Sequence, residues 1–155
     1  MSNVNLFLKQ CKALVFTLTE AKEIENSRLD MSDWVKSFNS PTVKHFCNTV
    51  ACVCGHQAVS KRLKYFMQAD ADMYPEQMAI RISLDLVNAC PEDGELAISI
   101  FVANMDKRLR AATDSGLFSE CELKNSNHLN KNEPSFDDSI EYINVCIKKV
   151  KETYL

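Results

Sequence analysis

Apolar residues recur every three or four positions over residues 5–24, which is the spacing of one face of an α-helix. The residues of this face are Leu8, Cys11, Val15 and Leu18. Polar residues dominate 23–30, where we expect a loop. The chain therefore opens with a long amphipathic helix that packs one side against a core.

A second, shorter helix is predicted around Trp34, the only tryptophan of the chain. Ser32 is a favourable N-cap for it, and Met31 precedes the cap, where it can pack against the first helical turn. An Asn-Ser-Pro sequence at 39–41 then interrupts the chain.

Residues 47–67 are predicted to form a third helix. Its inward positions are Val50, Cys54, Ala58 and, further on, Leu63. Positive charge complements the C-terminal end of a helix, because the helix dipole is negative there. Three basic residues lie near that end: Lys61, Arg62 and Lys64.

The pattern over residues 75–112 has two interpretations. Apolar and polar residues alternate over 80–86 and 96–102, on either side of a Pro-Glu-Asp-Gly sequence at 91–94, which is typical of a β-hairpin at about 79–102. Proline followed by an acidic residue, at 75–76 and at 91–92, is instead typical of helix starts. We favour two helices, the second of which continues into the strongly helical sequence 105–112 and is capped by Gly116.

The C-terminal helix is the clearest of the predicted elements. Ser135 is its N-cap, two aspartates follow in the first turn, and lysines lie near its end. Its buried face consists of Ile140, Ile143, Ile147 and Val150. Residues 119–135, which precede it, are rich in Asn, Lys and Ser, and we expect a surface loop there.

Only three glycines and four prolines occur in 155 residues, which favours a few long elements over a many-turned β fold. We therefore predict a mainly α fold, with residues 1–155 forming a single helical domain of five to seven helices. The alternative is an α+β fold that contains the hairpin.

The charge of the chain argues against a nucleic-acid partner. Its 21 acidic and 18 basic side chains are mixed along the sequence and give a formal net charge of −3, whereas proteins that hold nucleic acid by bulk electrostatics are basic. No stretch approaches the roughly 18 consecutive apolar residues of a membrane span, so we expect no membrane association.

Seven cysteines is an odd number, so they cannot all pair within one chain. The N-terminal residues also lack the basic and long apolar regions of a signal peptide. We therefore expect a cytoplasmic protein with free cysteines, most of which act as small core residues.

Five potential soft-metal ligands lie within residues 45–56: His45, Cys47, Cys52, Cys54 and His56. In a helix, Cys52 and His56 share one face, whereas Cys54 points away from both. If a metal site exists, its ligands are Cys47, Cys52 and His56. A recognisable second half of a zinc site is missing, so we predict no cofactor and keep zinc as the alternative.

The same block has a catalytic and a packing interpretation. Cys47 at a helix start could act as a nucleophile, with His128 or another histidine as its base. No oxyanion loop accompanies it, and we predict no catalytic residue and no enzyme. In the packing interpretation, Gly55 allows another backbone or the Trp34 ring to approach, and His56 donates a hydrogen bond to a carbonyl.

A family resemblance follows from two motifs that together span about residues 29–66. The first is Met31-Ser32-x-Trp34, and the second runs from Cys47 to Ala58. They resemble a group of small uncharacterised phage and prophage proteins that have a Met-Ser-x-Trp segment followed by a Cys-Gly-Thr-Val-Ala-Cys-x-x-Gly-His-like helix. This chain departs from that pattern at Asn48, where the group has Gly, and at Cys54, where it has Ala.

The resemblance implies a phage context and a mostly helical fold, and it implies no activity. We therefore expect a non-enzymatic accessory protein that binds and modulates a host protein in the host cytoplasm, and that could also form homo-oligomers. A zinc-stabilised binding module, or a cysteine-dependent enzyme, is the alternative. The residues that we expect at an interaction surface are Trp34, Lys61, Arg62 and Lys64.

Overall fold

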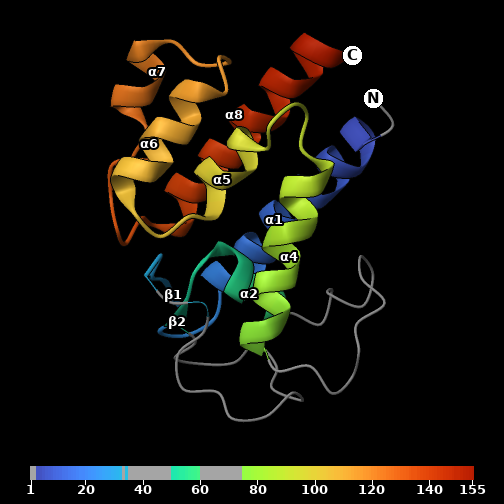
Figure 1. Ribbon diagram of the computed structural model, residues 1–155. Helices are drawn as coiled ribbons and strands as arrows, with labels where there is room; N and C mark the ends of the chain where they lie inside the picture. The colour runs from blue at the N-terminus through green and yellow to red at the C-terminus, as the bar shows by residue number, and fades with distance from the viewer. Residues whose placement is uncertain (1–2, 33, 35–49, 60–74) are drawn as a thin grey trace.

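The computed structural model of the chain describes residues 3–32, 34, 50–59 and 75–155. This described part contains seven α-helices and one pair of two-residue strands, so the mainly α prediction is confirmed (Figure 1). The helices bury their apolar faces around one hydrophobic core.

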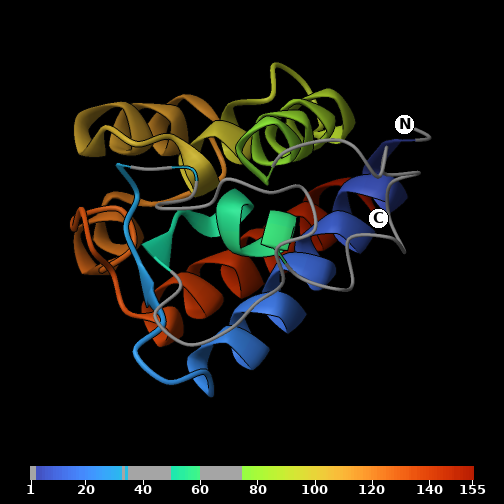
Figure 2. The ribbon, with the colours of Figure 1, turned by 90° about the horizontal axis from the view of Figure 1, so that it is seen from below.

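The first and last helices form the base of the molecule. Helix α1 spans Asn3–Lys22 and packs along helix α8, which spans Phe136–Tyr154 (Figure 2). Ser135 caps α8 as predicted, because its side chain accepts from the Asp138 amide while the Asp138 carboxylate accepts from the Ser135 amide. The predicted faces are buried, except that Val15 and Ile140 are half-buried.

The predicted helix over 47–67 begins later than expected. Residues Val50–Ala51 form strand β2, which pairs in parallel with strand β1, Arg28–Leu29, and helix α2 spans only Val53–Val59. The Asp30 amide donates to the Ala51 carbonyl at 3.0 Å. This pairing holds residues 50–51 in an extended conformation, so the expected helix start at Cys47 is wrong for the described residues 50–52.

Residues 75–101 form two helices and no hairpin. Helix α4 spans Pro75–Ala89 and helix α5 spans Glu95–Phe101. Glu92 and Gly94 both have positive φ, so the 91–94 sequence is a tight connection, and α5 starts after it and not at Pro91. Helix α6, Met105–Asp114, is separate from α5, because Val102 is extended and Asn104 caps the new helix.

The range 119–135, which we expected to be a surface loop, contains a short helix. Helix α7 spans Glu120–Asn125, and a reciprocal capping box between Ser119 and Glu122 starts it. Leu129, which follows it, is fully buried. Local capping therefore creates order in a sequence whose composition is typical of a loop.

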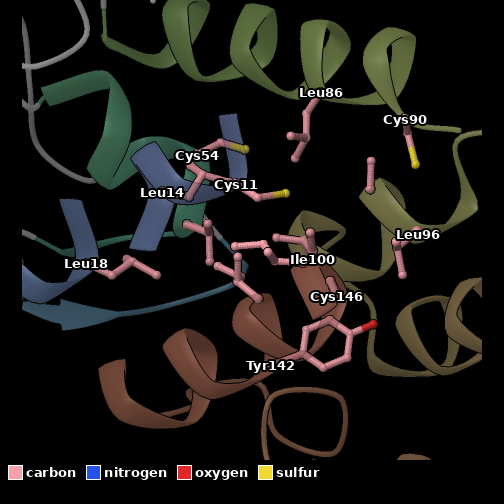
Figure 3. Packing of buried hydrophobic residues seen from close by; sticks show 14 of the residues in the cluster. Cys11, Leu14, Leu18, Cys54, Leu86, Cys90, Leu96, Ile100, Tyr142 and Cys146 are labelled. Carbon is pink, nitrogen blue, oxygen red and sulfur yellow. The ribbon is translucent and has the colours of Figure 1, made fainter. Parts of the chain in front are cut away.

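The thiols of the core behave as small hydrophobic groups. Figure 3 shows Cys11, Cys54, Cys90 and Cys146 among the aliphatic side chains that α1, α2, α4 and α8 bring together. Of the cysteines in the described part, only Cys121 is exposed, and all are free thiols. Burial raises the pKa of Cys11 and of Cys54 well above its ordinary value, so these thiols stay protonated near neutral pH.

Several predictions lie outside the described residues. They are the short helix beyond Trp34, the break at 39–41, the second half of the 47–67 helix, and the side chains of Cys47, Lys61, Arg62 and Lys64.

Candidate functional site

Helix α2 lies inside the molecule, between α1 and α4 (Figure 2). All of its residues are buried except Ala58, which is half-buried. A seven-residue helix is marginal in isolation, and burial on all sides supplies the stability that its length does not. The Cys- and His-rich block is therefore part of the core.

Cys52 has a capping role at the start of α2. Its Sγ accepts from the Gly55 amide at 3.3 Å, and its thiol lies 3.8 Å from the Trp34 carbonyl oxygen, to which it donates. The Cys52 carbonyl accepts the first helical hydrogen bond, from the His56 amide at 2.9 Å. A thiol here satisfies one of the amides that every helix start leaves without a partner.

Gly55 is required by the close approach of another backbone segment. A Cβ atom built on Gly55 would lie 1.5 Å from the Trp34 carbonyl oxygen. Contact at this distance is impossible without moving the backbone. The expectation that Gly55 admits another backbone is thus confirmed.

His56 is fully buried and is held by the first strand. Its Nε2 lies 2.8 Å from the Arg28 carbonyl oxygen, to which it donates, and its ring meets the Phe136 ring edge-on at 5.2 Å. A carbonyl can only accept, so this hydrogen bond places the proton on Nε2. The expected donation to a carbonyl is confirmed.

Cys52 and His56 are the described members of the predicted metal site, and both already bond backbone groups. Among residues 3–32, 34, 50–59 and 75–155, no three His, Cys, Asp or Glu side chains gather in a way that could hold a metal ion. Cys121 is exposed on α7 and His128 is enclosed in the core, so they do not form a second half-site. Zinc stays a hypothesis that elemental analysis tests.

A cavity of about 230 Å³ lies beside Trp34. Its walls are mostly apolar, and the Trp34 and Phe101 rings lie 6.5 Å apart at 33°. The residues that line it are Met31, Ser32, Trp34, Cys52, Phe101, Val102 and Ala103. Trp34 is half-buried, so one part packs against the core and the rest faces this cavity.

Two hydrogen bonds, one between distant segments and one local, hold the cavity-lining residues Met31 and Ser32. The Met31 amide donates to the Asn132 carbonyl at 3.2 Å, and the Asp30 carboxylate accepts from the Ser32 amide at 3.0 Å. The cavity is therefore largely formed before any ligand arrives, which lowers the ordering cost of binding.

Arg108 of α6 lies in the basic sequence 107–110, and the structure buries it completely. Its guanidinium donates to the carbonyls of Val102, at 2.8 Å, and Ala103, at 2.7 Å, and also to that of Lys131. The first two carbonyls end α5, where positive charge is favourable. Basic residues usually mark a solvated face, so no local signal identifies this one as internal.

His128 lies beside Arg108 in the same polar cluster. Its Nε2 donates to the Ile100 carbonyl at 2.8 Å, its Nδ1 lies 2.8 Å from Ser139 Oγ, and its ring stacks on Tyr142 at 4.9 Å. Burial, and secondarily the Arg108 charge, lowers the pKa of His128 to about 4. Both ring nitrogens are bonded and the residue is 0% exposed, so the imidazole has no nitrogen left for a substrate.

A second cavity, of about 240 Å³, lies between α7 and α8. The stacked rings of Phe118 and Tyr142, 5.6 Å apart, form part of its wall. Its carboxylates include Glu122, which pairs with Lys149 at 2.9 Å. This wall carries three carboxylates, of Glu122, Asp138 and Glu141, so it is more polar than the wall of the cavity beside Trp34 and is less suited to an apolar side chain.

No helix of the described residues has the length and apolar character needed to cross a bilayer. Comparison of the chain with protein-family models, with curated proteins and with solved structures gave no match. The candidate site therefore rests on its own geometry: a preformed apolar cavity walled by Trp34 and Phe101.

Proposed function

We propose that this chain is a non-enzymatic phage- or prophage-type accessory protein that binds and modulates a host protein in the host cytoplasm. One observation carries the proposal, namely the apolar cavity at Trp34. Aromatic residues and methionine are enriched where proteins bind proteins, and partner side chains insert into preformed pockets of this kind.

The dimensions of the cavity favour a single apolar side chain of a partner. A volume of about 230 Å³ has room for a leucine, methionine or phenylalanine side chain, and the wall offers few polar groups to orient a small polar metabolite. The half-buried Trp34 provides large contact area with little conformational entropy to lose, because the core already holds it.

Site-specific photocrosslinking tests the proposal. A photoreactive phenylalanine analogue at Ala103, which is exposed at the cavity, is expected to form one discrete covalent adduct in a lysate of the host bacterium. The same analogue at Lys151, an exposed position on α8, is the control and is expected to form no such adduct.

A second pair of variants links the adduct to the cavity. V102E adds a charge to the apolar wall and is expected to reduce the adduct by about tenfold or more, because the charge must be desolvated on binding. V145E changes an equally half-buried valine of the other cavity and is expected to leave the adduct unchanged. No adduct from position 103, or equal loss in both variants, contradicts the proposal.

A further inference from the structure

Helix α4 has two apolar faces. Ile82 and Leu86 point into the core and are 8% and 1% exposed, whereas Ile80 and Leu84 lie one turn apart on the outer face and are 40% and 57% exposed. The apolar residues at every second position, which resembled a strand pattern, therefore form two rows on opposite sides of α4. Residues two apart differ by about 200° around a helix.

The outer row of α4, Ile80 and Leu84, does not belong to the hydrophobic core that the described residues form. α4 lies at the upper edge of the molecule in Figure 2. Two large aliphatic side chains in succession on a solvent face cost solubility and add nothing to the core, which is typical of a contact surface.

Two opposite charges lie on one flank of this face. At about 100° per residue, Arg81 and Asp85 fall on one side of the outer face, and Ile80, Leu84 and the half-buried Val87 fall on the other. The ion pairs recorded in the described part of the chain include neither Arg81 nor Asp85. The flank thus carries one basic and one acidic group, one turn apart. If a second copy of the helix runs in the opposite direction, its acidic group lies opposite the basic group of the first copy, and the reverse.

We propose that two copies of this chain associate through α4, with the two helices antiparallel across a two-fold axis near residue 83. In an antiparallel pair, the charged flank of one helix meets the charged flank of the other. Arg81 of each copy then lies opposite Asp85 of the other copy. The aliphatic flanks of the two helices also meet, and Ile80 of one copy packs between Leu84 and Val87 of the second copy. A parallel pair would place the charged flank against the aliphatic one, which is unfavourable.

The contact is expected to be weak and dependent on concentration. A 15-residue helix is about 22 Å long, so one pair of helices buries less area than the standard interface of about 800 Å² per partner. The Trp34 cavity is lined by no residue of α4, so this dimer is independent of the proposed function.

Sedimentation equilibrium of the full chain tests the dimer, from about 5 µM to about 1 mM, a range that spans weak affinities. The wild-type average mass is expected to rise from 17.6 kDa towards twice that value. L84E is expected to stay monomeric throughout. L6E changes a leucine of α1 that is also exposed, at 47%, and is expected to dimerise like the wild type.

A charge exchange tests the orientation. R81D places two carboxylates opposite each other at both ends of the contact and is expected to weaken dimerisation at least tenfold, whereas R81D/D85R restores it. A monomeric wild type at the highest concentration, or equal behaviour of L84E and L6E, overturns the dimer. Failure of the double variant to recover overturns the antiparallel arrangement. Circular dichroism checks that each variant keeps its helix content.

Discussion

Individual residues in this protein owe their roles to what the fold places against them. Gly55 shows this most directly, since its hydrogen atom faces the Trp34 carbonyl oxygen where any side chain would collide. Cys52 and His56 are residue types that bind metals, and in the structure Cys52 caps helix α2 and His56 donates to strand β1. Their chemistry is used locally, to satisfy backbone groups in the core.

The first prediction at this scale concerns Gly55. G55A is expected to lower the free energy of unfolding by about 3 kcal/mol or more, because the added Cβ forces the Trp34 backbone away. G116A is the control: it meets nothing within 4 Å, so only its positive φ of 70° costs energy, about 1 kcal/mol. Urea unfolding measures both, and a smaller loss for G55A than for G116A would contradict the proposed contact.

His128 provides the second prediction. Its pKa is about 4 in the folded chain against 6.5 in the unfolded one, so the unfolded state binds a proton first. The stability contributed by the neutral imidazole is complete above pH 6.5 and is lost as the pH falls towards 4, by about 2 to 3 kcal/mol at about pH 4.5.

H128Q tests this pH dependence, because glutamine cannot titrate. Unfolding by urea at about pH 7.5 and about pH 4.5 is expected to show a drop in stability that is about 2 kcal/mol smaller in H128Q than in the wild type. An equal drop in both proteins would assign the acid sensitivity to other groups.

At the scale of elements, capping residues determine where helices begin. Ser119 and Ser135 each make a reciprocal box with the acidic residue three positions later. The two helices differ in what they bury: α8 buries seven residues, and α7 buries only Leu123. The same local motif therefore has different consequences for the stability of the molecule.

S135A is expected to lower the global free energy of unfolding by about 1 kcal/mol, because the start of α8 loses an acceptor for the Asp138 amide. S119A removes the equivalent acceptor from α7 and is expected to increase hydrogen exchange mainly within α7, with less effect on global unfolding. Urea unfolding with hydrogen-exchange mass spectrometry separates the two effects. A larger global loss in S119A than in S135A would contradict this assignment.

At the scale of the whole molecule, one buried charge joins three segments. Arg108 of α6 donates to the carbonyls that end α5 and to that of Lys131, next to the Asn132 carbonyl that holds Met31. The C-terminal half is thereby connected to the segment that carries Trp34. The shape of the cavity depends on this connection, since Val102 and Ala103 line the cavity and also accept hydrogen bonds from Arg108.

R108M is expected to lower the free energy of unfolding by about 3 kcal/mol or more, because it leaves buried carbonyls without donors. R108K is expected to lose less, since a single ammonium cannot reach all three carbonyls but keeps the charge. R110M, at an exposed position of the same helix, is the control and is expected to change stability by at most about 0.5 kcal/mol. Comparable losses for R108M and R110M in urea unfolding would show that the guanidinium is not internal.

The sequence alone determined the parts of this protein that depend on local interactions. The amphipathic faces of α1 and α8 and the Ser135 cap follow from side-chain periodicity and capping. At 75–101 the alternating pattern alone was compatible with a hairpin, and the proline and acidic residue at the start of α4 favoured a helix. The role of Gly55 in a close backbone approach was also predictable, because glycine among buried small residues has few other uses.

Only the tertiary structure decided which polar side chains lie inside. The burial of Arg108 and His128, the shortening of the 47–67 helix by strand pairing, and the cavity beside Trp34 all depend on segments far apart in the chain. A periodic pattern reports which residues share a face, but it does not report what that face meets. The two apolar rows of α4 illustrate this limit, since the fold buries Ile82 and Leu86 and leaves Ile80 and Leu84 exposed.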